Sequence, residues 1–226
     1  RELVSGSGVQ ISLQQFKEVL LRLQNEEHAA ISTWLRQHTI RLASLLPLGG
    51  LRDSRVLTIP VVYNTSSFDS LEALSLMRGK VDVISLTFKY ASALEAGKLS
   101  HAPRYPEIAL AAIEEMVAQV PVWEEDDEGL LLKGVIVRHL VLPGRVEESK
   151  RALATLHDRF GGSVRLSIMS QYTPLASGLE RYGLAGRVTE EEYEEVLDYA
   201  DSLGVEDYFS AQGDAAQESF VPEFKW

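Results

Sequence analysis

The sequence contains no cysteine among its 226 residues. Disulfides and thiolate metal sites are therefore impossible in this chain. No apolar run approaches the roughly 20 residues that a bilayer span needs, and the start lacks the pattern of a secretory signal. Basic residues are few, 22 Lys and Arg against 33 Asp and Glu, and the net charge of -11 disfavours phosphate binding. We therefore expect a soluble, cytoplasmic protein that binds neither membranes nor nucleic acid.

Common phosphate-binding and metal-binding motifs are also missing. There is no GxGxxG turn and no phosphate loop ending in GK[ST], and "SGSG" at Ser5–Gly8 lacks both the preceding strand and the Lys. The acidic run "EEEYEEV" has helical spacing without a convergent His, which is typical of a solvated helix face near an N-terminus. No ligand spacing relates the histidines, His28, His38, His101, His139 and His157. We expect no metal site among these residues.

What the sequence does contain is an alternation of strand and helix patterns, within a chain that is 45% hydrophobic and large enough for one well-packed domain. The predicted strands are 57–64, 81–88, 135–142 and 163–170. The predicted helices begin near Ser12, Ser70, Tyr105, Val146 and Thr189, the last with a Thr189/Glu192 capping box and a stop at Gly204, and 124–129 is a solvated loop. The alternation predicts parallel βαβ units, in an open doubly wound sheet or a closed or partly closed barrel.

In both of these arrangements the chemistry gathers where the strands end. Polar or conformationally special residues occur at or just after the end of each predicted strand. They are Asn64, Thr65, Thr87, Lys89, Leu142–Gly144 and Ser170–Tyr172. These positions are the candidates for ligand contact on physical grounds alone.

Six segments resemble a known family in order and spacing: "PVVYNTSSFDSLEAL", "VDVISLTFKYAS", "SHAPRYPE", "GVIVRHLVLPG", "SIMSQYTP" and "VTEEEYEEVLDYADSLGVED". The family is that of the radical S-adenosylmethionine (SAM) proteins similar to pyruvate formate-lyase activating enzymes. The resemblance covers about residues 60–226. "RHLVLPG" and "MSQYTP" together are more specific than any one segment alone.

The resemblance implies an α/β fold, a partial (β/α)6 TIM-like barrel whose first strand is missing or incomplete here. It also implies a [4Fe-4S] cluster held by a CxxxCxxC loop, with SAM bound at the open iron. Reduction would cleave SAM to a 5'-deoxyadenosyl radical that abstracts a hydrogen atom, as in a radical SAM oxidoreductase. The implied partners are an electron donor and a protein substrate such as a glycyl radical enzyme.

Because the cluster cysteines are absent, this chain cannot hold the cluster. We expect residues 1–226 to be a single truncated radical SAM-like domain, with the cysteine loop encoded upstream, and to be inactive as it stands. The alternative is a non-catalytic α/β scaffold that retained the fold for protein binding. A natural start near Arg1 would favour that alternative.

Residues 27–56 depart from the family, which has a strand reading N-I-N-L-V-T-P-T-H-Y where this chain has "AISTWLRQHTI". Permitted codons for residues 30–40 can be written so that a shifted reading frame encodes that run without a gap. Trp34 has a single codon, which leaves no freedom at its position, so ten successive agreements are unlikely to arise by chance. We interpret 27–56 as a frameshifted segment. A naturally divergent segment is the alternative.

The resemblance and the strand ends together assign SAM-binding roles to seven residues: Asn64, Thr65, Lys89, Arg138, His139, Gln171 and Tyr172. Alternation places Arg138 and His139 on opposite faces of their strand. Arg138 either faces the ligand or pairs with an acid such as Asp82, and His139 either lines the cavity or donates to a backbone carbonyl. Tyr172 is a ligand contact or part of a turn, and Lys89 contacts the ligand or extends to solvent.

Overall fold

The computed structural model describes residues 2–4, 10–12, 60–174, 177–205 and 207–210. The chain divides into two compact units, the first formed by Arg1–Leu86 with Ala111–Val135 and the second by Thr87–Leu110 with Ile136–Trp226. Strands β1 (Glu2–Val4) and β2 (Gln10–Ser12) pair antiparallel. The helix predicted after Ser12 and the segment 27–56 lie outside the described residues.

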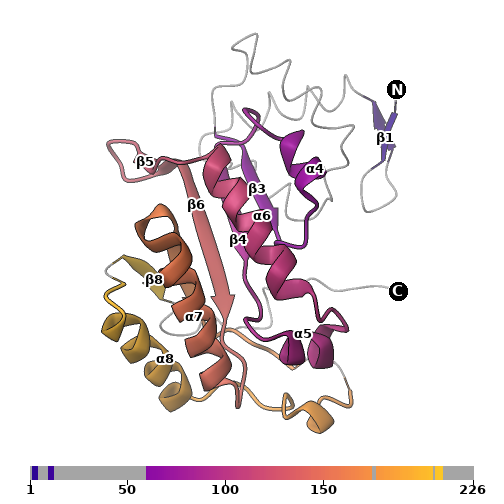
Figure 1. Ribbon diagram of the computed structural model, residues 1–226, viewed down its shortest axis with the longest axis vertical. Helices are drawn as coiled ribbons and strands as arrows, with labels where there is room; N and C mark the ends of the chain where they lie inside the picture. The colour runs from indigo at the N-terminus through magenta and orange to yellow at the C-terminus, as the bar shows by residue number, and fades with distance from the viewer. Residues whose placement is uncertain (1, 5–9, 13–59, 175–176, 206, 211–226) are drawn as a thin grey trace. The chain divides into compact units, whose positions relative to one another are not determined.

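Most of the described strands belong to one sheet (Figure 1). Its strands, in spatial order, are β3 (Val62–Thr65), β4 (Val83–Thr87), β6 (Leu131–Leu140), β7 (Arg165–Met169) and β8 (Tyr208–Ser210). β3 pairs parallel with β4, β6 with β7, and β7 with β8. This confirms the predicted α/β class with a parallel sheet. The partial barrel is a more specific statement and stays a prediction.

In the first unit, β3 leads into the short helix α4 (Leu71–Ser75). The predicted start at Ser70 is confirmed, because its hydroxyl accepts a hydrogen bond from the Ala73 amide at 3.2 Å and caps the helix. The core contains the buried side chains of Leu74, Val83, Ile84, Leu86, Ile113 and Met116. Asp82 is buried beside this core, and its carboxylate accepts from the Val61 amide at 2.8 Å.

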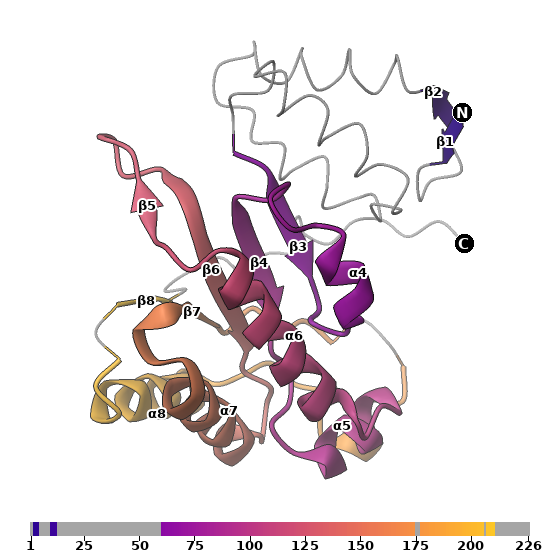
Figure 2. The same ribbon diagram turned by 45° about the horizontal axis from the view of Figure 1, so that its top comes forward.

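The same unit contains a hairpin where the sequence predicted only a loop (Figure 2). β5 (Glu124–Glu125) pairs antiparallel with the start of β6. The turn is held by Asp126, whose side chain accepts hydrogen bonds from the amides of Glu128 and Leu130. Gly129 adopts φ 79° in this turn, a conformation that favours glycine. The prediction of a loop over 124–129 was therefore only partly right.

In the second unit, helices α7 (Val146–Phe160) and α8 (Glu190–Ser202) run side by side (Figures 1 and 2). Lys150 of α7 forms an ion pair with Glu195 of α8 at 2.6 Å. The Tyr193 hydroxyl ties α8 to β7 by donating to the Ile168 carbonyl at 2.8 Å. The core between these elements contains Val137, Ala152, Leu153, Leu156, Ile168 and Val196.

Most of the predicted helices occur, with small differences at their ends. α7 and α6 (Tyr105–Gln119) begin at the predicted residues, and α8 begins with the predicted Thr189/Glu192 capping box. α5 (Ala93–Ser100) was not predicted. It is capped by Ser92, whose hydroxyl accepts from the Leu94 and Glu95 amides. Two further helical turns in the described residues are η1 (Gly161–Ser163) and η2 (Glu180–Tyr182).

Across the described parts of the chain, every helix is too short or too polar to span a bilayer. Within the same residues, no three His, Asp or Glu side chains converge in a way that could hold a metal ion. The cytoplasmic location and the nature of the partners stay predictions.

Candidate functional site

In the second unit, the carboxyl ends of three strands meet at one edge. The Phe88 amide, just after β4, donates to the Arg138 carbonyl at 2.9 Å. The Val141 amide, just after β6, donates to the Met169 carbonyl at 2.9 Å, and the register pairs Leu140 with Met169. The residues that follow these strands therefore share an edge. Of the predicted site residues, Lys89, Gln171 and Tyr172 lie on it.

Arg138 and His139 face opposite sides of β6, as the alternation predicted. Val135, Val137 and His139 are buried, whereas Arg138 and its alternate neighbours are half-buried. The guanidinium of Arg138 donates from Nη2 to Thr87 Oγ1 at 3.1 Å. The side chain of Arg138 therefore reaches from β6 to the end of β4, on the sheet face away from His139. Its pairing with Asp82 stays a prediction.

His139 is a core residue in this structure, with 2% of its surface exposed. Its Nδ1 lies 2.9 Å from the Phe88 carbonyl and its Nε2 lies 3.0 Å from Ser149 Oγ. Because a carbonyl can only accept, Nδ1 carries the hydrogen and Nε2 accepts from the Ser149 hydroxyl. Burial lowers the pKa of His139 below its ordinary value, against the opposing effects of the Phe88 carbonyl and Glu148. His139 thus makes the predicted contact to a backbone carbonyl, and its role in SAM binding stays a prediction.

Tyr105 fixes the backbone at the end of β4. Its hydroxyl donates to the Thr87 carbonyl at 2.7 Å and accepts from the Lys89 amide at 3.0 Å. The Tyr105 ring packs edge-on against Tyr90, with centroids 5.7 Å apart, and burial raises the pKa of the Tyr105 hydroxyl. The Lys89 side chain is exposed, and within the described residues nothing binds its ammonium group. Among the residues that the structure describes, the Lys89 ammonium is thus a cation without a partner, carried on a backbone position that Tyr105 fixes.

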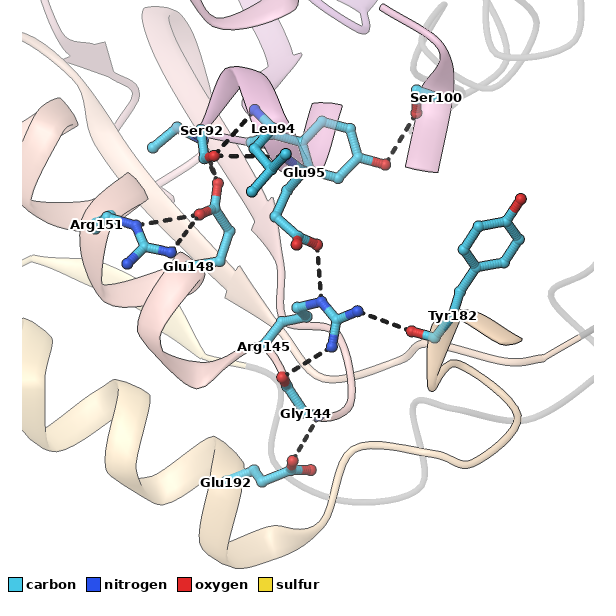
Figure 3. A network of polar contacts seen from close by, with 12 residues as sticks. Ser92, Leu94, Glu95, Ser100, Gly144, Arg145, Glu148, Arg151, Tyr182 and Glu192 are labelled. Atoms are coloured by element: carbon cyan, nitrogen blue, oxygen red, sulfur yellow. Dashed lines mark hydrogen bonds and ion pairs between the residues drawn. The ribbon is translucent and has the colours of Figure 1, made fainter. Parts of the chain in front are cut away.

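Glu148, in the first turn of α7, holds the turn between β4 and α5 (Figure 3). Its Oε1 accepts hydrogen bonds from the amides of Ala91 and Ser92, at 2.8 and 2.7 Å. Its Oε2 accepts from Nη2 and Nε of Arg151, at 2.8 and 3.2 Å. A carboxylate that is 5% exposed is stable in this position because both oxygens have partners.

Arg145 joins three segments beside Glu148 (Figure 3). Its Nε donates to Glu95 of α5 at 2.8 Å, its Nη1 to the Gly144 carbonyl at 3.0 Å and its Nη2 to the Tyr182 carbonyl at 2.8 Å. A groove of about 420 Å³ runs along this network. It is lined by Glu95, Lys98, Gly144, Arg145, Val146, Glu147, Glu148 and Arg151. Three cationic and three anionic side chains balance in it, so the lining has no net charge.

The space beneath Lys89 is almost completely filled. The cavity there measures about 10 Å³, which is near the minimum that one water molecule needs. Lys89, His139, Glu148 and Ser149 are among its lining residues. A ligand at the strand ends must therefore meet Lys89 from the solvent side.

Gln171 and Tyr172 follow β7 and differ in how firmly their side chains are held. Gln171 is exposed, and its amide nitrogen lies 3.6 Å from the Met169 sulfur. The Tyr172 hydroxyl donates to the Leu184 carbonyl at 2.9 Å, and its amide donates to the Ser170 carbonyl at 2.8 Å. Tyr172 therefore fixes a turn in this structure. Its role in ligand binding stays a prediction.

Asn64 and Thr65 belong to the first unit, at the end of β3. Asp69 organises this strand end, because its two carboxylate oxygens accept hydrogen bonds from the hydroxyls of Tyr63 and Thr65 at 2.9 and 2.5 Å. Burial and the neighbouring Asp69 raise the pKa of Tyr63. Ser67 is fully buried in the same turn with φ 64°, a conformation that is uncommon outside glycine.

Four residues that organise these strand ends were missed from the sequence: Asp69, Glu95, Arg145 and Glu148. In the sequence, Glu148 reads as an ordinary acid in the first turn of a helix. Its partners Ala91 and Ser92 are 57 and 56 residues away. Local patterns therefore gave no indication of its role.

Comparisons with known proteins give weak likenesses. No family model matches the chain. An uncharacterized protein of Methanocaldococcus jannaschii is 26% identical over 148 residues, which cover 66% of this chain and 40% of that protein. A solved structure, a radical SAM methyltransferase from Sphaerobacter thermophilus, matches 76% of this chain and 57% of its own with 12% identity and a TM-score of 0.41. This chain thus spans less than two thirds of either protein, and a structural likeness of this size carries no argument about function.

Proposed function

We propose that this chain is a SAM-binding domain of the radical SAM type, resembling pyruvate formate-lyase activating enzymes. The support is the order and spacing of the six segments described above, together with the parallel α/β sheet on which they lie. The segments "FKYAS", "RHLVLPG" and "MSQYTP" fall where β4, β6 and β7 end, which is where ligands bind in sheets of this kind.

The observation that carries the proposal is the edge shared by these strand ends in the second unit. Lys89 and Arg138 supply positive charge there, and Gln171 supplies an amide. SAM carries a carboxylate and ribose hydroxyls that such groups can bind through charge-assisted and neutral hydrogen bonds. In this proposal Lys89 binds the carboxylate, and Arg138 and Gln171 bind polar groups of the nucleoside. Tyr172 is a further proposed contact, and the roles of Asn64 and Thr65 in SAM binding stay predictions.

The donor set of this chain does not fit a [4Fe-4S] cluster. Such clusters are held by cysteine thiolates, and the chain has none. No reaction step is therefore assigned to its residues. Reductive SAM cleavage, hydrogen-atom abstraction, an electron donor and a glycyl radical enzyme as protein substrate are proposals for a protein that also supplies the cluster ligands.

The first test is direct titration of the full chain with SAM in an isothermal calorimeter. We expect saturable binding, and we expect Lys89→Met to weaken it by about tenfold, since a charge-assisted hydrogen bond is worth about 1.5–3 kcal/mol. Lys98→Met is the matched control, because Lys98 is also an exposed lysine of the second unit but lies on α5 in the groove. If Lys98→Met rather than Lys89→Met weakened binding, the ligand site would lie in the groove instead.

The absence of cysteine favours one alternative, a non-catalytic α/β scaffold that binds protein. The same titration separates the two functions. A scaffold without a ligand site would give no heat of binding with SAM, while circular dichroism would show a folded chain.

A further inference from the structure

The turn that carries Lys89 is held by hydrogen bonds at successive backbone positions. The Phe88 amide donates to the Arg138 carbonyl, and the Phe88 carbonyl accepts from His139 Nδ1. The Lys89 amide donates to the Tyr105 hydroxyl. These contacts fix the chain on the strand side of Lys89, and they come from β6 and α6.

On the other side of Lys89, the backbone is held by Glu148. The amides of Ala91 and Ser92 both donate to Oε1 of this carboxylate, at 2.8 and 2.7 Å. Ser92 is also the N-cap of α5, so the same contact sets where α5 begins. Two short hydrogen bonds to one oxygen of a largely buried carboxylate are strong contacts, because the acceptor is charged.

We infer that Glu148 is a positioning residue for the ligand site at the strand ends. It does not touch the ligand. By holding Ala91 and Ser92, it keeps the turn in one conformation. The Lys89 ammonium can then bind an anionic group of the ligand without the loss of entropy that ordering the turn would cost. This inference rests on the proposed function, because it takes Lys89 as a ligand contact.

Arg151 provides a matched control for Glu148. Arg151→Ala removes the partner of Oε2 but leaves Oε1 bound to the two amides. Because 59% of the Arg151 side chain is exposed, water can replace it at Oε2. Glu148→Ala removes the contacts to both amides. Glu148→Gln keeps an acceptor oxygen of the same reach and is the conservative variant for rescue.

The experiment measures two quantities for the full chain and these three variants. Native-state hydrogen exchange reports the opening of the turn, and calorimetric titration with S-adenosylhomocysteine reports ligand affinity. We expect Glu148→Ala to speed exchange at the Ala91 and Ser92 amides at least tenfold and to raise Kd about tenfold. Arg151→Ala should change both less than about twofold, and Glu148→Gln should recover most of the affinity. If Glu148→Ala does not fold, Glu148→Asp replaces it, since it keeps the charge but is too short to reach both amides.

Each outcome decides the inference. Faster exchange at the turn with an unchanged Kd would overturn it, because an ordered turn would then have no effect on binding. Equal losses of affinity in Arg151→Ala and Glu148→Ala would also overturn it, because they would indicate a general loss of stability. If the unchanged chain bound no nucleoside while remaining folded, the proposed function itself would fail and the inference would fail with it. These patterns are distinct from one another.

Discussion

Arg145 and Glu95 form an ion pair of 2.8 Å in which neither side chain is more than a fifth exposed. Because the pair is largely removed from water, loss of one partner leaves the other charge without compensation. We expect Arg145→Met to lower the free energy of unfolding by about 3 kcal/mol. Urea denaturation followed by circular dichroism measures this loss.

A double-mutant cycle with Glu95→Gln separates the pair from the other contacts of Arg145, which reach the carbonyls of Gly144 and Tyr182. The two changes should couple by about 1–2 kcal/mol. Strict additivity would mean that Arg145 stabilises the fold only through those carbonyls.

A second prediction concerns the contact between Gly134 of β6 and Trp123, the residue before β5. A Cβ atom added at Gly134 would lie 2.6 Å from a carbon of the Trp123 ring. The ring must shift to admit it, so Gly134→Ala should cost about 1–3 kcal/mol of stability. Gly162→Ala is the control, since no atom lies within 4 Å of its added Cβ. Equal unfolding midpoints for the two variants in urea would contradict the close packing of Trp123.

The sequence predicted the parts of the fold that short-range patterns encode. Thr189 and Glu192 are three residues apart, and their capping box forms as expected. The faces of β6 also followed from alternation, with His139 buried and Arg138 half-buried on the other side. α5 escaped prediction because Ala96 is its one buried residue, which leaves no apolar periodicity to detect.

The candidate site was predictable only in part, for a related reason. Strand ends can be found in a sequence, so Lys89, Gln171 and Thr65 were placed correctly beside them. The residues that hold those ends act across long separations in the chain. Arg145 reaches Glu95 across 50 residues, and a single sequence contains no record of such a pairing.

Glu192 gives a third prediction, because it has a second contact besides the capping box. Its Oε1 accepts from the Gly144 amide at 2.7 Å, and its Oε2 accepts from the Thr189 amide at 3.0 Å. Glu192→Ala should therefore destabilise the fold by about 1–2 kcal/mol. Glu191→Ala is the matched control, since Glu191 is also an acid in the first turn of α8, where a negative charge interacts favourably with the helix dipole.

Thermal unfolding in the same buffer compares the two variants. A melting temperature of Glu191→Ala as low as that of Glu192→Ala would show that only the charge at the helix end matters. A lower value for Glu192→Ala alone would support the contact with Gly144.

His139 gives the last prediction, a dependence of stability on pH. Burial lowers the pKa of His139 below its ordinary value of 6.5, so below pH 6.5 the unfolded chain binds a proton that the folded chain refuses. The stabilisation is complete above pH 6.5 and is lost as the pH falls from 6.5 towards the lowered folded pKa, by up to about 1.4 kcal/mol per pH unit. Protonation would also reverse the contact with Ser149, because Nε2 could no longer accept a hydrogen bond from its hydroxyl.

Urea denaturation at several pH values between 5 and 7.5 should show a steeper loss of unfolding free energy for the unchanged chain than for His139→Gln. His157→Gln, on the partly exposed side of α7, should keep the steep dependence, and a His139→Gln curve parallel to both would assign the pH effect to other groups.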